Sequence, residues 1–337
     1  MSRLLIAGAF LWVVFFSGRV IQIGGIDPKF KDSGTQTLAP LQNYLGNLTQ
    51  RLTPYPQSAL FEGIVLGEGQ KIPYTLKHDL KSTSTIHIVV VSGQNLTILA
   101  GFVMGAAGWI GRRKAIYLTL STMIFYALLT GFQVPVVRAL MMVSLAYLGQ
   151  LTGRDKTGWW ILMLTGAAML LYNPNYLLNI SFQLSFLATF GVVVVSPLLE
   201  EGLQRLLNLV RQDLAVTLAA QAMVLPVIAY NFGQISLVGV AANLLVLWTI
   251  PLIMIGGAVS LLVGLTSTFW GTVTGLLPTI LVTYLIDTIR LFAGLPLASF
   301  RLTQTPPVLW AGYYLLLAAV LWTIFLRQER AMPTPAP

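Results

Sequence analysis

The chain has 337 residues, of which 56% are hydrophobic and 9% are charged, and its formal net charge is +9. Soluble domains carry about 25% charged residues, so this composition and a mean hydropathy of +0.77 exclude an ordinary soluble protein. The absence of cysteine excludes disulfide bonds, thiolate metal sites and cysteine nucleophiles, whereas the positive charge does not by itself indicate a polyanionic partner, because membrane proteins carry excess Lys and Arg to set their orientation.

Apolar runs long enough to cross a bilayer recur along almost the whole chain. A helical span needs about 20 mostly apolar residues, so we predict an all-α, polytopic membrane protein that forms one bundle of about ten transmembrane helices. The first run resembles a signal peptide, but no convincing small-residue cleavage site follows it, and we predict an uncleaved N-terminal helix over 1–23. The predicted spans are 4–23, 86–110, 115–132, 134–151, 158–173, 177–199, 214–232, 236–264, 270–293 and 306–326.

The run 236–264 is too long for one straight helix, and Pro251 divides it into one kinked span or two half-length spans. Short loops rich in Lys and Arg mark the cytoplasmic side of a membrane. When 236–264 crosses once, the basic loops, such as 112–114, fall on the same side as the basic tail. We therefore predict one crossing there, with both chain termini in the cytoplasm.

Residues 24–85 form a long segment between predicted spans, and we predict that it is extracytoplasmic and contains amphipathic helices. Apolar residues of its first part share one helical face, namely Leu41, Tyr44, Leu45, Leu48 and Leu52. This face lies either on the outer surface of the membrane or against the bundle. Residues 86–326 are predicted to form the main transmembrane domain, and 327–337 a disordered cytoplasmic tail.

The stretch TIHIVVVSGQNLTILAGF places polar residues inside a predicted span, namely His87, Ser92, Gln94 and Asn95. Polar groups at membrane depth are costly unless they find partners or line a wet cavity. Ser92 and Gly93 can break a helix, so the stretch either lines a polar path or ties helices together. An intramembrane serine hydrolase is not favoured, because a lone histidine and serine five residues apart are weak evidence.

Further polar residues fall at membrane depth in later spans. They are Arg138, Asn179, Gln183, Gln221, Asn231, Gln234, Asn243, Asp287 and Arg290. The spacing of Asp287 and Arg290 favours a structural ion pair. Arg138 has no acidic residue near it in sequence, which makes it the first candidate for a functional charge. With two histidines and no cluster of ligands, no metal or other cofactor is predicted.

Four segments of the chain, taken in order, carry a resemblance to a known family. They are ALFEGIVLGEGQKIP with HIVVVSGQNLTILAGF, GFQVPVVRALMM, ISFQLSFLATFGVV, and LAAQAMVLPVIAYNFGQISLVGVAANLLVLWTIP. Their H-x4-S-G, R-A, S-F-Q-L-S-F and F-G-Q…N-L-L-x5-P patterns resemble the membrane competence domain of the ComEC family of DNA-uptake proteins. The resemblance covers residues 58–265, with weaker support as far as 326.

The chain departs from the family pattern at three points. Family members commonly have histidine two residues after Ser-Gly, where this chain has Asn95, so a proton-handling role there is in doubt. The segment 24–85 is too short for the OB-like domain that many members carry together with the amphipathic stretch. Many members also end in a metallo-β-lactamase-like domain, and no His/Asp cluster of that kind is present here, so no nuclease activity is expected.

The resemblance implies a multi-pass protein of the cytoplasmic (plasma) membrane that passes single-stranded DNA inward during natural transformation. The partners that it implies are the lipid bilayer, a DNA receptor, a separate nuclease, a cytoplasmic helicase and further copies of the chain. Two alternatives stay open: a secondary transporter of a small solute, which broken helices and polar groups at the midplane also fit, and a membrane scaffold of a DNA-uptake complex.

The polar residues of the matching segments are predicted to converge on one hydrated path, because isolated polar groups at membrane depth are costly. Its members are His87, Ser92, Gly93, Gln94, Asn95, Arg138, Gln183, Gln221 and Asn243. Arg138 is expected to contact phosphate, since its planar fork suits phosphate oxygens. The competing interpretation is that Arg138 is a structural charge paired with backbone carbonyls or with Asp287.

Overall fold

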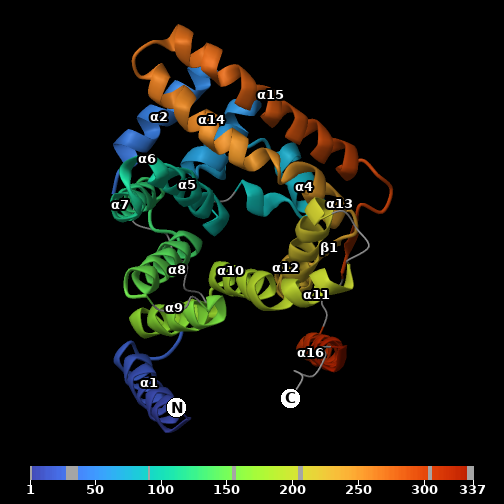
Figure 1. The fold of residues 1–337 in the computed structure, drawn as a ribbon. Coiled ribbons are helices and arrows are strands. Elements are labelled where there is room, and N and C mark those ends of the chain that lie inside the picture. Colours follow the sequence, from blue (N-terminus) through green and yellow to red (C-terminus); the bar gives the residue numbers. More distant parts are fainter. Residues whose placement is uncertain are drawn as a thin grey trace.

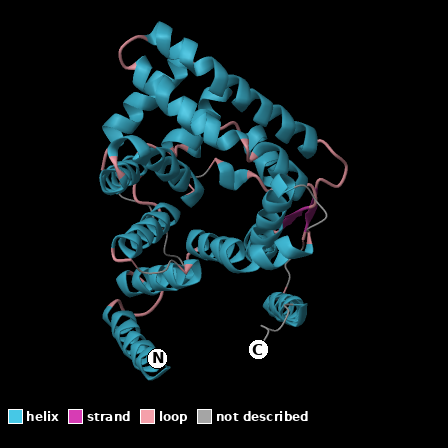
Figure 2. Cartoon of the chain, viewed as in Figure 1, coloured by secondary structure: helices cyan, strands magenta, loops and turns pink. Residues whose placement is uncertain are grey.

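The computed structural model describes residues 2–27, 37–89, 92–153, 157–203, 208–302 and 306–331, and most of them are helical (Figures 1 and 2). The first elements in chain order are α1 (Ser2–Gln22), α2 (Ala39–Leu52), α3 (Gln57–Phe61), the π-helix η1 (Glu62–Leu66), the 3₁₀ turn η2 (Gly69–Lys71), α4 (Tyr74–Ser82), the 3₁₀ turn η3 (Ile86–Ile88), α5 (Gly93–Gly105), α6 (Ala107–Ile110), α7 (Arg112–Thr130) and α8 (Val134–Leu151).

The elements of the second half follow in the same way and include one small sheet. They are α9 (Gly158–Tyr172), the 3₁₀ turn η4 (Pro174–Leu178), α10 (Ile180–Phe190), the π-helix η5 (Gly191–Val195), α11 (Ser196–Gly202), α12 (Asn208–Phe232), β1 (Gln234–Ser236), α13 (Gly239–Val246), α14 (Thr249–Gly264), α15 (Thr268–Ala293), β2 (Ser299–Arg301) and α16 (Pro307–Ala331). The predicted all-α class is thereby confirmed.

The predicted number of ten spans is not confirmed. Within the described residues, five helices are long and apolar enough to cross a membrane, and a sixth crossing arises if α13 and α14 are counted together. The five are 134–151, 180–202, 211–232, 268–293 and 308–326. The predicted span 86–110 is divided between η3, α5 and α6, so it contains no single long helix. Helix α9, over 158–172, is apolar but shorter than a typical span.

The long run 236–264 bends by 43° between α13 and α14. Pro251 lies in the first turn of α14, and the break itself falls at Leu247 and Trp248. Proline lacks an N–H group, and its ring clashes with the carbonyl of the residue four positions earlier, which here is Leu247. The proline therefore acts on the residue at the break rather than on its own position.

Helices α14 and α15 form an antiparallel hairpin whose contact surface consists of small residues (Figure 1). A Cβ atom on Gly271 would lie 2.6 Å from the Cα atom of Gly264, and one on Gly275 would lie 2.8 Å from the Oγ atom of Ser260. The Ser260 hydroxyl also donates a hydrogen bond of 2.8 Å to the carbonyl of Gly271. Small residues at four-residue spacing allow helices to approach closely inside a membrane.

The two short strands indicate how often the hairpin crosses the membrane. β1 pairs with β2 in antiparallel fashion, with Gln234 opposite Arg301 and Ser236 opposite Ser299. Because paired strands lie side by side, the chain between them crosses a membrane an even number of times. If α15 supplies one crossing, then α13 and α14 together supply one, as the sequence predicted for 236–264.

The segment 39–82 forms the largest core together with the hairpin and is not a separate outer layer. A Cβ atom on Gly264 would lie 2.8 Å from Leu52, one on Gly257 would lie 2.6 Å from Phe61, and one on Gly239 would lie 3.0 Å from Ser84. The chain from Leu52 to Ser84 therefore runs along the whole length of α13 and α14 in the opposite direction. Of the two alternatives for α2, packing against the bundle is the one observed, with Leu48 and Leu52 buried and Tyr44 exposed.

This packing bears on the predicted extracytoplasmic position of 24–85. If α13 and α14 cross the membrane, Leu52 lies at the opposite membrane face from Ser84, because it packs against the far end of α14. An outer position for the whole segment and a crossing by 236–264 therefore cannot both hold. Both stay predictions.

Single cysteines in this cysteine-free chain test the arrangement. We expect Arg51→Cys and Thr266→Cys to react with a membrane-impermeant maleimide from one side, because both residues are exposed near the turn between α14 and α15. Lys81→Cys and Leu237→Cys, which are exposed near β1, should react from the other side. Labelling of all four from the periplasmic or external side would instead support the predicted extracytoplasmic position of 24–85.

Candidate functional site

The start of α5 is built by Ser92 and Asn95. Ser92 is the N-cap residue, and its hydroxyl accepts a hydrogen bond of 3.3 Å from the backbone N–H of Asn95 and donates one of 2.9 Å to the Asn95 side chain. The amide of Asn95, which is 1% exposed, donates a 3.0 Å bond to the carbonyl of Ile64 in η1. The predicted break at Ser92 is thus the beginning of a capped helix tied to the preceding π-helix.

Arg138 lies in the first half of α8 and is 8% exposed. Its Nη1 atom contacts the hydroxyl of Thr189 on α10 and the sulfur of Met142, and its Nε atom has no hydrogen-bond partner among the described residues. None of the ion pairs formed by the described residues includes Arg138. Within the described part of the chain, the proposed structural partners, backbone carbonyls or Asp287, are therefore not observed.

Gly93 is the point at which α5 and α8 meet. A Cβ atom on Gly93 would fall on the Nη2 atom of Arg138, and it would lie 3.2 Å from both the Cβ atom of Ala139 and the carbonyl oxygen of Pro135. Position 93 therefore has no room for a side chain, because the guanidinium and the first turn of α8 occupy the adjacent space. Two segments that are far apart in the sequence are brought into direct contact here.

The electrostatics of this contact favour an anion. The first backbone N–H groups of a helix have no acceptor within the helix and carry a partial positive charge. The Ser92 hydroxyl satisfies the N–H of Asn95, whereas those of Gly93 and Gln94 have no such cap among the residues that the structure describes. A buried guanidinium without a carboxylate partner lies against this same turn. Positive groups that converge in this way are chemically suited to hold an anion.

A second polar cluster lies between η3 and β1. The imidazole Nδ1 atom of His87 lies 3.0 Å from the carbonyl of Ser84. A Cβ atom on Gly239 would lie 2.9 Å from the amide nitrogen of Gln221, 3.0 Å from the Cβ atom of Ser84 and 3.2 Å from the hydroxyl of Ser236. The Oε1 atom of Gln221 is buried and has no hydrogen-bond partner among the described residues. Gln221 and Ser84 also line one small pocket.

The residues that were predicted to line one path therefore lie in separate places in the structure. Ser92, Gly93, Asn95 and Arg138 belong to the first cluster, and His87 and Gln221 to the second. Gln94 is exposed on α5, and the Gln183 amide donates a 2.9 Å bond to the carbonyl of Leu177. Asn243 is buried in α13, where its Oδ1 atom has no partner among the described residues.

Two further predictions concern charges and metals. Asp287 and Arg290 are both exposed on α15, and the ion pairs of the described residues do not include them, so the predicted pair is not observed. The parts of the chain that the structure describes contain no group of three or more His, Cys, Asp or Glu residues able to hold a metal ion.

Sequence reasoning missed Thr189 and Ser84. Thr189 lies six residues after Gln183 in the same matching segment, and its position beside Arg138 depends on the packing of α8 against α10. A threonine inside an apolar helix is common, since its hydroxyl bonds the carbonyl four residues earlier, as Thr189 does with Ser185 at 2.8 Å. No signal in the sequence separates this threonine from the others.

Comparison with known proteins adds the following. The model of a family described as competence protein matches residues 64–327. The uncharacterized protein YcaI of Escherichia coli (strain K12) is 30% identical over 257 residues, which cover 71% of this chain and 33% of that protein. ComE operon protein 3 of Bacillus subtilis (strain 168) is 27% identical over 234 residues, which cover 68% of this chain and 30% of that protein. The chain thus spans about a third of the length of these relatives. No solved structure matches.

Proposed function

The chain belongs to the competence protein family, and on this premise we propose that it forms a channel in the plasma membrane through which single-stranded DNA passes inward during natural transformation. The chain is a multi-pass membrane protein with several apolar helices, as the family membership and the structure agree. Its similarity to a protein named for the ComE operon supports a part in competence. What we propose beyond this is that the substrate is single-stranded DNA, that it moves inward, and that the membrane is the plasma membrane.

The observation that carries the proposal is the arginine without a counter-ion. Arg138 lies in the second turn of α8 and is buried, and an arginine buried within a membrane helix is costly unless it is paired or lines a water-filled path, so it indicates a functional site. Arg138 is buried against the start of α5 and has no acidic partner among the described residues. A passing phosphate would supply the missing negative charge, and its oxygens would accept from the guanidinium and from the N–H groups of α5.

A conducting path requires weak binding at each site, since a tightly bound strand would not move on. One buried cation at the start of α5 meets this requirement better than a row of arginines would. No phosphate-binding GxxxxGK[ST] motif occurs in the sequence, so we assign the driving force to a partner such as a cytoplasmic helicase. We likewise assign strand degradation to a separate nuclease and DNA capture to a receptor, and allow the channel to be an oligomer.

Uptake of labelled DNA tests this function directly. A strain of the source organism that lacks the gene is expected to take no labelled DNA into the cytoplasm, while still binding DNA at its surface, and the full-length chain should restore uptake. A secondary transporter would instead leave DNA uptake intact and abolish accumulation of a small solute. A scaffold would lose surface-bound DNA as well, because receptor assembly would fail. Intact uptake in the deletion strain would overturn the proposal.

A further inference from the structure

Helix α12 contains a proline whose effect on the helix is offset by a helix much later in the chain. Pro226 lies inside α12 and has no N–H group, so the carbonyl of Ala222, four residues earlier, loses its usual partner within the helix. The Tyr313 hydroxyl on α16 donates a hydrogen bond of 3.0 Å to this carbonyl, and the Tyr314 hydroxyl donates one of 2.9 Å to the carbonyl of Met223. Two adjacent tyrosines thus supply donors at the weak point of α12.

Helix α16 is otherwise loosely attached. Only 6% of its apolar part is buried, against 39% for that of α12, and Figure 1 shows α16 at the edge of the molecule. The side chains with which it packs on the described core are Tyr314, Leu317 and Leu321, which lie on the cluster that contains Met223. A helix with so narrow a packed face can move away from its neighbour without opening the largest core.

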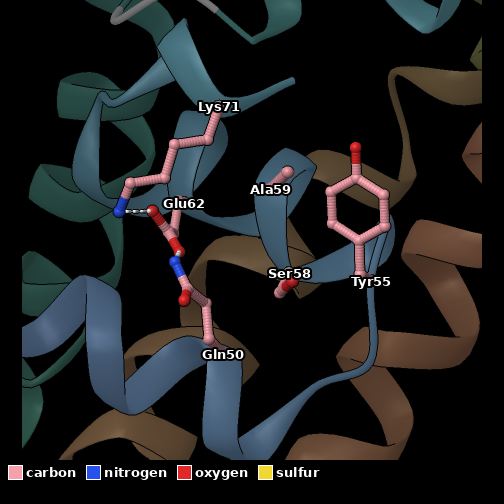
Figure 3. Close-up of a pocket in the computed structure, with 6 residues that line it drawn as sticks. All are labelled: Gln50, Tyr55, Ser58, Ala59, Glu62 and Lys71. Atoms are coloured by element: carbon pink, nitrogen blue, oxygen red, sulfur yellow. Dashed lines mark hydrogen bonds and ion pairs between the residues drawn. The ribbon is translucent and has the colours of Figure 1, made fainter. Parts of the chain in front are cut away.

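The bonds to α12 differ in kind from those of a local cluster. Glu62, in the wall of a pocket of about 300 Å³, is bonded by Gln50 and Lys71, which are 12 and 9 residues away in the sequence (Figure 3). The two tyrosines are 91 residues from the carbonyls that they bond. The partners of these α12 carbonyls are therefore lost whenever α16 moves, whereas the rest of α12 stays intact.

The opposite face of α12 borders the second polar cluster. A pocket of about 10 Å³, the space of one water molecule, lies between this face and Ser84 with β1. Its α12 wall consists of Gln221, Leu225 and Ile228, which share one face of the helix by their spacing. The same spacing places Met223, which lies against α16, on the other side. Helix α12 is thus held on one face by α16 and closes the pocket with the other.

We infer that α16 is a clamp on α12: its tyrosine pair keeps α12 stiff across Pro226, and its release lets α12 flex there and part Gln221 from Ser84. Helices kink at proline, and neighbouring helices restore stiffness by bonding the freed backbone groups. Because β1 follows the second half of α12 directly, flexing at Pro226 moves Gln221 relative to β1. The clamp therefore sets the width of the second polar cluster. This device goes beyond the proposed function and does not depend on DNA.

The test measures the stiffness of α12 with two spin labels on the full-length chain in lipid nanodiscs. The chain has no cysteine, so Val216→Cys and Tyr230→Cys, which are 37% and 59% exposed, place one label on each side of Pro226. The two positions are 14 residues apart, or about 21 Å along an unbroken helix. We expect a narrow distance distribution in this background and a clearly broader one when Tyr313→Phe and Tyr314→Phe are added, because phenylalanine keeps the ring and removes only the hydroxyl.

Two further variants show whether the effect is specific. Tyr284→Phe removes another tyrosine hydroxyl, which bonds the carbonyl of Leu245 at 3.1 Å, and it should leave the distribution narrow. Pro226→Ala restores the N–H group that Ala222 lacks, so in that background the loss of both hydroxyls should cause no broadening. An unchanged distribution in the double tyrosine variant would overturn the inference. So would equal broadening by Tyr284→Phe, or broadening that persists with Pro226→Ala.

Discussion

Arg138→Gln is expected to lower uptake of labelled DNA roughly ten- to a hundredfold, because hydrogen bonds to a charged group contribute about 1.5–3 kcal/mol. The folded yield in detergent should stay close to that of the wild type. Arg138 pairs with no carboxylate of the described residues, and Thr189 keeps its own bond to the carbonyl of Ser185 when the guanidinium is removed. Uptake is measured as protected label in cells, and folded yield by size-exclusion chromatography.

Two matched variants separate charge from hydrogen bonding. Arg138→Lys keeps the positive charge and loses the planar fork, so it should retain part of the uptake. Thr189→Val removes the hydroxyl that contacts the guanidinium and keeps the charge, so its effect should be smaller than that of Arg138→Gln. Normal uptake by a well-folded Arg138→Gln variant would refute the phosphate assignment. A collapse of its folded yield would instead indicate a structural arginine.

Gly93→Ala is expected to lower DNA uptake by a similar factor, because the new methyl group would occupy the position of the Arg138 guanidinium. The guanidinium is the end of a flexible side chain and can move away, whereas Ala139 and the carbonyl of Pro135 at 3.2 Å must yield by a few tenths of an ångström. Overpacking of this kind costs about 1–3 kcal/mol, so we also expect a moderate loss of thermal stability.

Gly101→Ala is the control for this substitution. Gly101 lies on the same helix, and a Cβ atom there has nothing within 4 Å, so uptake and stability should be unchanged. In the Arg138→Gln background, Gly93→Ala should add little to the loss of uptake, since the group that it displaces is already gone. Full additivity of the two effects would show that Gly93 acts independently of Arg138.

The sequence by itself determined the class of the protein and most of the polar residues of interest. A chain that is 56% hydrophobic and 9% charged cannot bury its apolar surface as a soluble domain, so a helical membrane protein followed from composition alone. The break at Ser92 and Gly93 was also predicted from the sequence, whereas the role of Ser92 as the N-cap of α5 came from the structure. The isolation of Arg138 followed from the absence of acidic residues near it in the chain.

Tertiary structure decided which of these residues meet. The sequence predicted one convergent path, but His87 and Gln221 lie by Ser84, whereas Gly93 lies by Arg138. Helix periodicity tells which residues share a face of one helix and nothing about which helix that face meets. In a membrane, helices associate through small residues and local packing, because lipid is as apolar as the helix surfaces.

The segment 39–82 is the clearest example of contacts that the sequence alone did not predict. Its apolar face was predicted to lie either on the membrane surface or against the bundle, and Leu60, Phe61 and Ile64 lie in the largest core. Glu62 is buried there because Lys71 and Gln50 neutralise and bond it, and because Gly46 leaves room for the pair. A buried charge is stable only when its partners are in place, and here the carboxylate and its two partners come from three different elements, η1, η2 and α2. Their meeting depends on the path of the chain through space, which hydropathy and spacing do not encode.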